Sequence, residues 1–287
     1  MRPLRYEVRR GPTPDGSAGG TCVAPSVATL AGLLAIGFLA AGCSSGASSA
    51  AEIGLGPDRP VVGACRVLTL ADIAPATNQT PPVSCRSPHT AVTISVGGFL
   101  RSRVTNANLS DGTLGNDALK RCTASWRRTV GGDTATQDLS VVGLAYYLPT
   151  SAELSKGARW YRCDLVIGGQ DGMRLRDLPA HVAGLLDGPL PDSLRACRTA
   201  PDFQSGHQVA CSRPHVLRAV GTTSLPDRTS YPGKAALKAA SAKGCLPVVR
   251  RWLKGKDDGG IAYQWPDANG WRLLGDRTAT CWTVTTD

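Results

Sequence analysis

The chain has 287 residues, and its 32 lysines and arginines against 22 acidic residues give it a formal net charge of +10. Its basic residues form no dense run. The charge therefore favours anionic neighbours such as lipid headgroups or phosphate-bearing polymers and argues against nucleic acid, although moderate basicity also serves solubility alone. With four histidines, no Gly-x-Ser-x-Gly motif and no glycine-rich phosphate loop, the sequence indicates neither a nucleophilic catalytic site nor a cofactor.

The first 42 residues are typical of an export signal. Four arginines precede an uncharged run at residues 27–42, which is too short for a comfortable bilayer span and ends in small residues just before Cys43. The sequence LAAGC at residues 39–43 resembles a bacterial lipobox, which implies cleavage before Cys43 and acylation of its sulfur. An uncleaved membrane anchor and a simple secretory signal are the alternatives.

Residues 43–59 are expected to form a flexible tether, because residues 44–51 are rich in Ser, Gly and Ala and have no hydrophobic period. We expect this tether to hold a folded part against the extracytoplasmic face of the membrane through the lipid on Cys43. Removal of residues 1–42 takes away four arginines and two acids, so a net charge of +8 would remain.

One short motif occurs twice in the remaining chain: VSCRSPH at residues 83–89 returns as VACSRPH at residues 209–215. The other cysteines fall at matching places, with steps of 20, 37 and 41 residues in one set and 14, 34 and 36 in the other. Loops tolerate such differences in length, whereas cores do not. The sequence therefore predicts two repeats, at 60–170 and 192–287, joined by a linker at 171–191.

Each repeat is predicted to fold as β-β-α-β-β, which makes the fold class α+β with two tandem domains. The predicted strands are residues 66–70, 92–96, 141–148 and 160–167, then 209–211, 216–220, 261–265 and 278–285. Helices are predicted at 116–130 and 234–253, and Pro247 is expected to kink or divide the second. The linker region from Gly168 to Asp192 is expected to hold at most one helical turn, near residues 182–186.

Eight cysteines remain once Cys22 and Cys43 are assigned to the export signal and the lipid, and an even number in an exported chain favours disulfides. The first pair of each repeat would close a hairpin-like segment, and the second would fasten the helix to the last strand. The predicted bridges are Cys65–Cys85, Cys122–Cys163, Cys197–Cys211 and Cys245–Cys281. Zinc is the alternative, because Cys-x3-His occurs twice, but there are no Cys-x2-Cys pairs and we predict no metal site.

The repeated histidines His89 and His215 are the candidates for a shared role, as proton acceptors or as ligands. The plainer interpretation, which we favour, is that each imidazole caps the turn after its cysteine through backbone hydrogen bonds. Arg86, Arg213 and Arg218 lie near these turns and are candidates for binding an anionic membrane or wall component.

A family resemblance is carried by Gly63-Ala64-Cys65, the motif at 83–89, Tyr146-Tyr147-Leu148-Pro149 and Trp160-Tyr161-Arg162-Cys163. Together these segments resemble the septum formation domain of exported or membrane-anchored proteins of actinobacteria. The second repeat is similar through Cys197, residues 209–215, Cys245, Trp265-Pro266 and Cys281. The acidic residue that often follows the histidine in this family is absent here. The resemblance implies a cell-envelope protein connected with division, and it supplies no catalytic residue and no ligand.

We therefore expect a non-catalytic envelope lipoprotein whose tandem domains bind an envelope protein or an anionic wall or lipid component. The alternative is a hydrolase of wall polymers that uses a carboxylate the sequence does not single out; on a glycosidic bond it would need two carboxylates roughly 5–10 Å apart. Because each repeat holds two bridges and one helix, the sequence also predicts that residues 60–170 and 190–287 each fold alone when oxidised.

Overall fold

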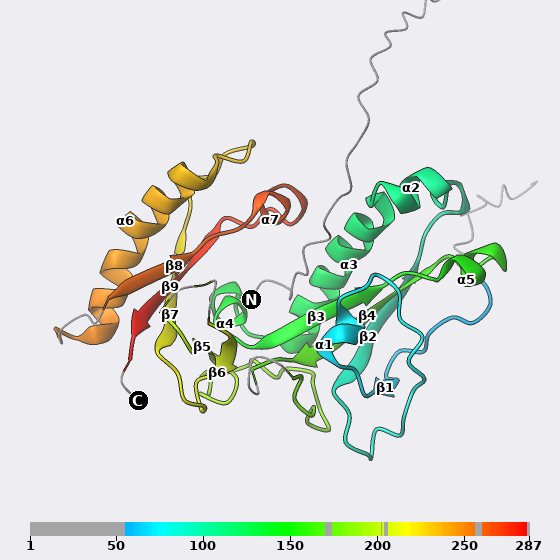
Figure 1. Cartoon of the computed structure of the whole chain (residues 1–287), viewed down its shortest axis with the longest axis horizontal. Helices are drawn as coiled ribbons and strands as arrows, with labels where there is room; N and C mark the ends of the chain where they lie inside the picture. The colour runs from blue at the N-terminus through cyan, green and yellow to red at the C-terminus, as the bar shows by residue number, and fades with distance from the viewer. Residues whose placement is uncertain (1–54, 170–173, 202, 204–205, 256–259, 286–287) are drawn as a thin grey trace, which may run out of the picture. The chain divides into compact units, whose positions relative to one another are not determined.

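The computed structural model describes residues 55–169, 174–201, 203, 206–255 and 260–285 (Figure 1). The predicted export signal, Cys43 and most of the predicted tether lie outside these residues. Among the described residues, no helix combines the length and the apolar character needed to span a bilayer.

The first sheet has four antiparallel strands in the order β1-β2-β4-β3. These strands are β1 (Cys65–Arg66), β2 (Ala91–Gly98), β3 (Val142–Tyr147) and β4 (Trp160–Ile167). Strand β4 is buried along its whole length, because β2 and β3 flank it and both of its faces are covered. At the edge formed by β1, Val83 pairs with Cys65 through an isolated antiparallel bridge.

Helix α3 (Thr113–Val130) packs against this sheet (Figure 1). Its buried face repeats every four residues, through Leu114, Ala118, Cys122, Trp126 and Val130, which places these side chains in one row along the helix. The remaining helices of this part are short. They are α1 (Leu70–Ile73), the 3₁₀ turn η1 (Arg101–Arg103), α2 (Asn106–Ser110), α4 (Thr134–Asp138) and α5 (Ser151–Ser155).

The second sheet has five antiparallel strands in the order β6-β5-β7-β9-β8. These strands are β5 (Ala196–Arg198), β6 (Gln208–Ala210), β7 (Leu217–Ser224), β8 (Ile261–Gln264) and β9 (Thr278–Val284). Helix α6 (Lys234–Leu253) packs on β7, β8 and β9, and α7 (Ala268–Leu273) lies between β8 and β9 in the chain (Figure 1).

Pro247 lies inside α6, which runs from Lys234 to Leu253 as one helix. Of the two predicted effects of this proline, a kink or a division of the helix, the division is wrong. A proline removes one backbone hydrogen bond and costs a helix interior about 3 kcal/mol. The helix nevertheless continues because its buried side chains again recur every four residues and hold both halves on the sheet. These side chains are Leu237, Ser241, Cys245, Val249 and Leu253.

The two sheets share one order of corresponding strands. Val83, β1, β2, β4 and β3 follow one another in the first sheet as β6, β5, β7, β9 and β8 do in the second. The register also shifts at the same place, between Thr93 and Ser95 in β2 and between Ala219 and Gly221 in β7. The fold is thus mixed α/β with two antiparallel sheets, in agreement with the coarse part of the predicted fold class.

The predicted strand at residues 66–70 is wrong beyond Arg66, where β1 ends. Thr69 begins helix α1 instead: its side chain accepts a hydrogen bond from the backbone N–H of Asp72, and the Asp72 carboxylate accepts one from the backbone N–H of Thr69. This reciprocal capping box gives hydrogen-bond partners to the backbone N–H groups of Thr69 and Asp72. It therefore stabilises the start of the helix.

The described part of the segment predicted to be a linker packs into the folded part. Leu178 and Leu186 are buried in the same cluster as Trp126 and Val130 of α3. Residues 183–186 form a hydrogen-bonded turn, where a single turn is predicted, and the described part of the segment holds no helix. The backbone N–H of Leu186 donates to the carbonyl of Val130 at 2.7 Å. Because the last carbonyls of a helix have no partner within it, this segment supplies a partner to the end of α3.

One buried cluster joins side chains from both sheets and from α3. It contains Cys122 and Trp126 of α3, Leu165 of the first sheet, and Ala210, Leu217 and Trp282 of the second sheet. Backbone hydrogen bonds cross between the same parts, from Val141 N to Leu194 O at 2.8 Å and from Ala196 N to Leu139 O at 2.7 Å. The two sheets therefore share a core.

Candidate functional site

The eight cysteines in the described part of the chain form four disulfides. The pairs are Cys65–Cys85, Cys122–Cys163, Cys197–Cys211 and Cys245–Cys281, with Cα–Cα distances of 5.3, 5.3, 4.9 and 5.2 Å. These are the pairs that the sequence predicts. In each sheet one bridge fastens the long helix to a central strand, and the other fastens the first short strand to the turn that carries the repeated histidine.

The strongest arrangement for a metal among the described residues is Cys197, Cys211 and His215, whose ligand atoms lie within 4.8 Å of one another. Both sulfurs belong to one disulfide. Zinc is bound by thiolates, and a disulfide sulfur is not one. The donor set of the oxidised protein therefore does not fit zinc.

The repeated histidines take the same conformation in both turns. The Nδ1 atom of His89 donates to the carbonyl of Ser87 at 2.8 Å, and that of His215 donates to the carbonyl of Arg213 at 2.7 Å. Both residues are buried. This is the turn-capping contact of the plainer interpretation, and it occupies one ring nitrogen of each histidine.

The three candidate arginines differ in their surroundings. Arg86 and Arg213 are exposed, whereas the side chain of Arg218 is 16% exposed. Arg218 forms an ion pair with Asp192 through both of its terminal nitrogens. The hydrogen bond from Arg218 is also the main cause of the lowered pKa of Asp192. The charge of Arg218 is therefore balanced within the protein, and the repeated turns offer Arg86 and Arg213 as open cations.

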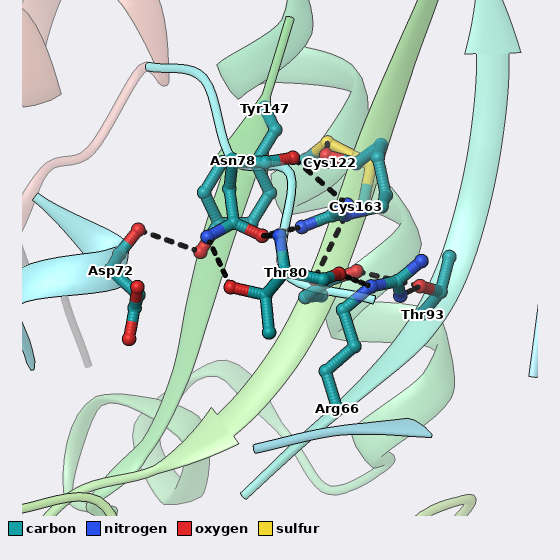
Figure 2. Close-up of polar contacts among 10 residues, drawn as sticks. Arg66, Asp72, Asn78, Thr80, Thr93, Cys122, Tyr147 and Cys163 are labelled. Atoms are coloured by element: carbon teal, nitrogen blue, oxygen red, sulfur yellow. Dashed lines mark hydrogen bonds and ion pairs between the residues drawn. A yellow bond between two sulfur atoms is a disulfide. The ribbon is translucent and has the colours of Figure 1, made fainter. Parts of the chain in front are cut away.

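A cluster of buried charges that the sequence did not single out lies on the first sheet (Figure 2). Its members on strand β4 are Arg162 and Asp164. Cys163, between them, bonds to Cys122 of α3, and side chains alternate along a strand. Arg162 and Asp164 therefore project from the face opposite α3, the face that the segment from Leu55 to Pro82 covers.

Asp164 is the centre of this cluster. Its Oδ2 lies 3.0 Å from Nε of Arg162, and its Oδ1 accepts a hydrogen bond at 2.8 Å from the hydroxyl of Thr93. That hydroxyl in turn accepts one at 2.8 Å from Nη1 of Arg66 on β1. The side chain of Asp164 is fully buried, and burial raises the pKa of its carboxyl, an effect that the charges of Arg162 and Arg66 oppose.

The two arginines also hold a loop on the sheet (Figure 2). Nη2 of Arg162 donates to Oδ1 of Asn78 at 2.9 Å, and Nε of Arg66 donates to the carbonyl of Thr80 at 3.1 Å. The guanidinium of Arg162 stacks over the ring of Tyr147, 4.2 Å from its centre. Planar guanidinium groups suit such combined stacking and forked hydrogen bonding.

A cavity of about 340 Å³ opens beside this loop. Its lining includes Ala64, Arg66, Asn78, Trp160 and Arg162. Asp164, in contrast, is fully enclosed and has an oxygen on each of two partners, so it cannot reach a molecule in the cavity. The arrangement suits the binding of a ligand by the cationic donors of Arg66 and Arg162. The lining also includes two carboxylates, Asp58 and Glu153.

The sequence did carry one signal for this cluster. Strand β4 reads WYRCDLVI, so Arg162 and Asp164 fall two residues apart on one face of an otherwise apolar, fully buried strand. Arg and Asp are almost never fully buried unless they are paired. Two opposite charges at that spacing therefore indicate a buried ion pair, although not its partners Arg66, Thr93 and Asn78.

The fold and the cavity describe a disulfide-stabilised α/β protein whose cavity is lined by buried arginines. A family model described as septum formation matches residues 120–281, which is more than half of the chain. The chain belongs to this septum formation family, and membership suggests a role related to cell division. Comparison with curated proteins and with solved structures found no significant match. Arg162 and Asp164 lie within the matched residues, and Arg66 and Asn78 precede them.

Proposed function

We propose that this protein is an exported, lipid-anchored component of an actinobacterial cell envelope that takes part in septum formation by binding and catalyses no reaction. The match of residues 120–281 to the septum formation family carries this proposal. Export is supported by the four disulfides, because such bridges form and persist in oxidising compartments and are rare in the cytosol.

The proposal includes two tandem copies of one domain. The common strand order, the matching register shift in β2 and β7, and the identical contacts of His89 and His215 support the duplication. A duplicated scaffold with one disulfide pattern suits a protein that presents surfaces to partners. The partner is an envelope protein or an anionic wall or lipid component, for which the net charge of +8 that remains after removal of residues 1–42 is favourable.

A binding role fits the chemistry of the described residues better than hydrolysis does. Asp164 is not among the residues that line the cavity, and it is enclosed by Arg162 and Thr93. The carboxylates in the lining are Asp58 and Glu153. Glu153, which lines the cavity, accepts hydrogen bonds at 2.7 Å from both the backbone N–H and the hydroxyl of Thr150 at the start of α5. Turnover of purified wall fragments by the protein would contradict this part of the proposal.

The decisive experiment compares the native protein with a Cys43→Ala variant in the native host. We expect the native protein in the membrane fraction and enriched at division septa, since Cys43 is the proposed site of acylation. The variant should leave the membrane fraction, because a lipid chain contributes about 0.8 kcal/mol for each buried CH₂ group. Unchanged membrane retention of the variant would contradict the lipid anchor, and an even distribution of the native protein would contradict the septal role.

A further inference from the structure

The cavity on the first sheet is lined by two arginines that are almost fully buried. Arg66 is 5% exposed and Arg162 is 3% exposed, and both line the space of about 340 Å³. Ligand-binding cavities in proteins typically measure roughly 300–1,000 Å³. A guanidinium in such a position has exchanged most of its water for protein partners, so its remaining N–H groups are costly to leave unpaired.

Both arginines keep hydrogen-bond donors that the protein does not fully use. A guanidinium carries five N–H groups. Arg66 uses Nε on Thr80 and Nη1 on Thr93, and no hydrogen bond from its Nη2 is found among the described residues. Nη1 of Arg162 reaches only the carbonyl of Asn78, at 3.5 Å. One terminal nitrogen on each arginine is thus available to a ligand in the cavity.

The two buried guanidinium groups share one buried carboxylate. Arg66 and Arg162 carry two positive charges, and Asp164, which pairs with them, carries one negative charge. The pKa of Arg66 is lowered by burial and by the nearby charge of Arg162. The lining also holds one further cation and two carboxylates, namely Arg59, Asp58 and Glu153. A ligand with one negative charge would therefore pair with the buried guanidinium groups, and a ligand with several charges would meet these carboxylates.

The second sheet shows that the fold does not require these charges. Thr93 pairs with Asp164 across β2 and β4, and at the corresponding place of β7 and β9 Ala219 pairs with Trp282. There Arg198 stacks on Phe203 at 4.8 Å, and Phe203 packs edge-on against Trp282 at 5.7 Å. Apolar packing often replaces buried ion pairs with no loss of stability. The sheet itself therefore does not need the charges of the first sheet. Part of their donors hold the loop at Asn78 and Thr80, and the remaining donors are available to the cavity.

We propose that this cavity binds a ligand through one singly charged oxygen group, a carboxylate or a phosphodiester, held by Nη2 of Arg66 and Nη1 of Arg162. Trp160, on the cavity wall, packs against the rest of the ligand. Arginine is suited to this role, because its planar donors match the two oxygens of either group. The inference adds a ligand class to the proposed binding function. It depends on that proposed function in one respect only, namely the compartment in which the protein would meet the ligand.

The test uses the purified, oxidised protein, titrated with sodium acetate or with dimethyl phosphate at constant ionic strength set by sodium chloride. The Nε–H signals of Arg66 and Arg162 in ¹H–¹⁵N spectra report on the site. We expect at least one probe to shift these signals to saturation. A response to acetate alone assigns a carboxylate, a response to dimethyl phosphate alone assigns a phosphodiester, and a response to both assigns their shared chemistry.

The key variant is Ala64→Phe, which fills the cavity from its wall without removing any side chain of the charged cluster. It should weaken binding about tenfold or more, as expected when a charge-assisted contact is lost. Lys120→Ala is the matched control, since it removes an exposed positive charge from α3, on the opposite side of the sheet, and should bind as the native protein does.

The inference fails if neither probe shifts the arginine signals beyond the effect of chloride, or if Ala64→Phe binds as tightly as the native protein. Arg66→Lys adds an independent check, because it keeps the charge and removes the forked donors, and it should also bind more weakly. Since these titrations do not depend on location in a cell, failure of septal localisation would leave their outcome unchanged, and their failure would leave the localisation test intact.

Discussion

At the scale of single residues, Asp164 is the carboxylate that balances the buried arginines of the charged cluster. It is fully buried and stands between Arg162 and the hydroxyl of Thr93, which connects it to Arg66. Removing its charge would leave two buried guanidinium groups with no counter-ion. Measurements on buried pairs show that loss of one partner is far more costly than the net value of the pair, because the other charge stays desolvated.

We therefore expect Asp164→Asn to lower the free energy of unfolding by about 3–5 kcal/mol. Asp192→Asn is the matched control, since it also breaks an arginine pair, but with a carboxylate that is 51% exposed. Exposed pairs contribute about 0–1 kcal/mol, so the control should lose no more than that. Denaturant unfolding under oxidising conditions measures both. Equal losses in the two variants would show that the cluster is not coupled as described.

At the scale of helices and strands, the disulfides differ in their access to solvent. Cys85 is exposed, whereas Cys122, Cys163, Cys245 and Cys281 are fully buried. Thiol–disulfide exchange requires that the attacking thiolate reach a sulfur. The bridges that fasten the long helices to the sheets are therefore shielded, and the Cys65–Cys85 bridge at the first edge strand is open to attack.

Limited reduction of the native protein should accordingly open Cys65–Cys85 before the other three bridges. Alkylation of the released thiols followed by peptide mass mapping would follow the order. In denaturant the preference should disappear, because every bridge is then exposed. Release of Cys122 or Cys281 at the rate of Cys85 in the native state would contradict the described burial.

The long elements could be predicted because their patterns are long. Helices α3 and α6 have 18 and 20 residues, and the four-residue repeat of buried side chains runs through most of each. The limits predicted for α6 are those observed. Strand β1 has two residues, too few for any alternation to appear. Helix α1 has four residues, and the sequence signal that could have indicated it, the capping box from Thr69 to Asp72, was missed in favour of a strand.

The candidate site was harder to predict for a different physical reason. Its residues come from β1, β2, β4 and the loop at Asn78, which only the pairing of the strands brings together. Arg66 and Arg162 are 96 positions apart in the sequence, and no local pattern joins them. The repeated motif, in contrast, is local, because all of its residues lie within seven positions at 83–89 and again at 209–215. It could therefore be identified from the sequence, and the structure shows capping contacts of its histidines.

At the scale of the whole molecule, the two halves of the chain share a buried core. The sequence predicts that residues 60–170 and 190–287 fold alone, but Trp126 packs in one cluster with Leu186 and Leu217. Gly169 sits at the junction: its carbonyl accepts a hydrogen bond at 2.9 Å from the N–H of Ala210. We expect the two sheets to unfold in a single transition.

Gly169→Ala tests this junction. Gly169 has φ of +81°, and a Cβ there would lie 2.7 Å from the backbone nitrogen of Ala210. Gly157→Ala is the control, with φ of +98° and open space around its Cβ, so it should cost only the backbone penalty of about 1–2 kcal/mol. The clash at Gly169 should add about 1–3 kcal/mol to that penalty. Equal losses in thermal or denaturant unfolding, or two separate transitions in the native protein, would contradict a shared core.

The four disulfides have a further consequence for how the protein matures. Every bridge joins a cysteine of the described chain to the very next one, since the pairs are Cys65–Cys85, Cys122–Cys163, Cys197–Cys211 and Cys245–Cys281. A chain that meets an oxidant from its N-terminal end onward would form each of these bridges as soon as the second cysteine emerges. A simple dithiol oxidase would then suffice from Cys65 onward, and no isomerase would be needed to rearrange mispaired sulfurs.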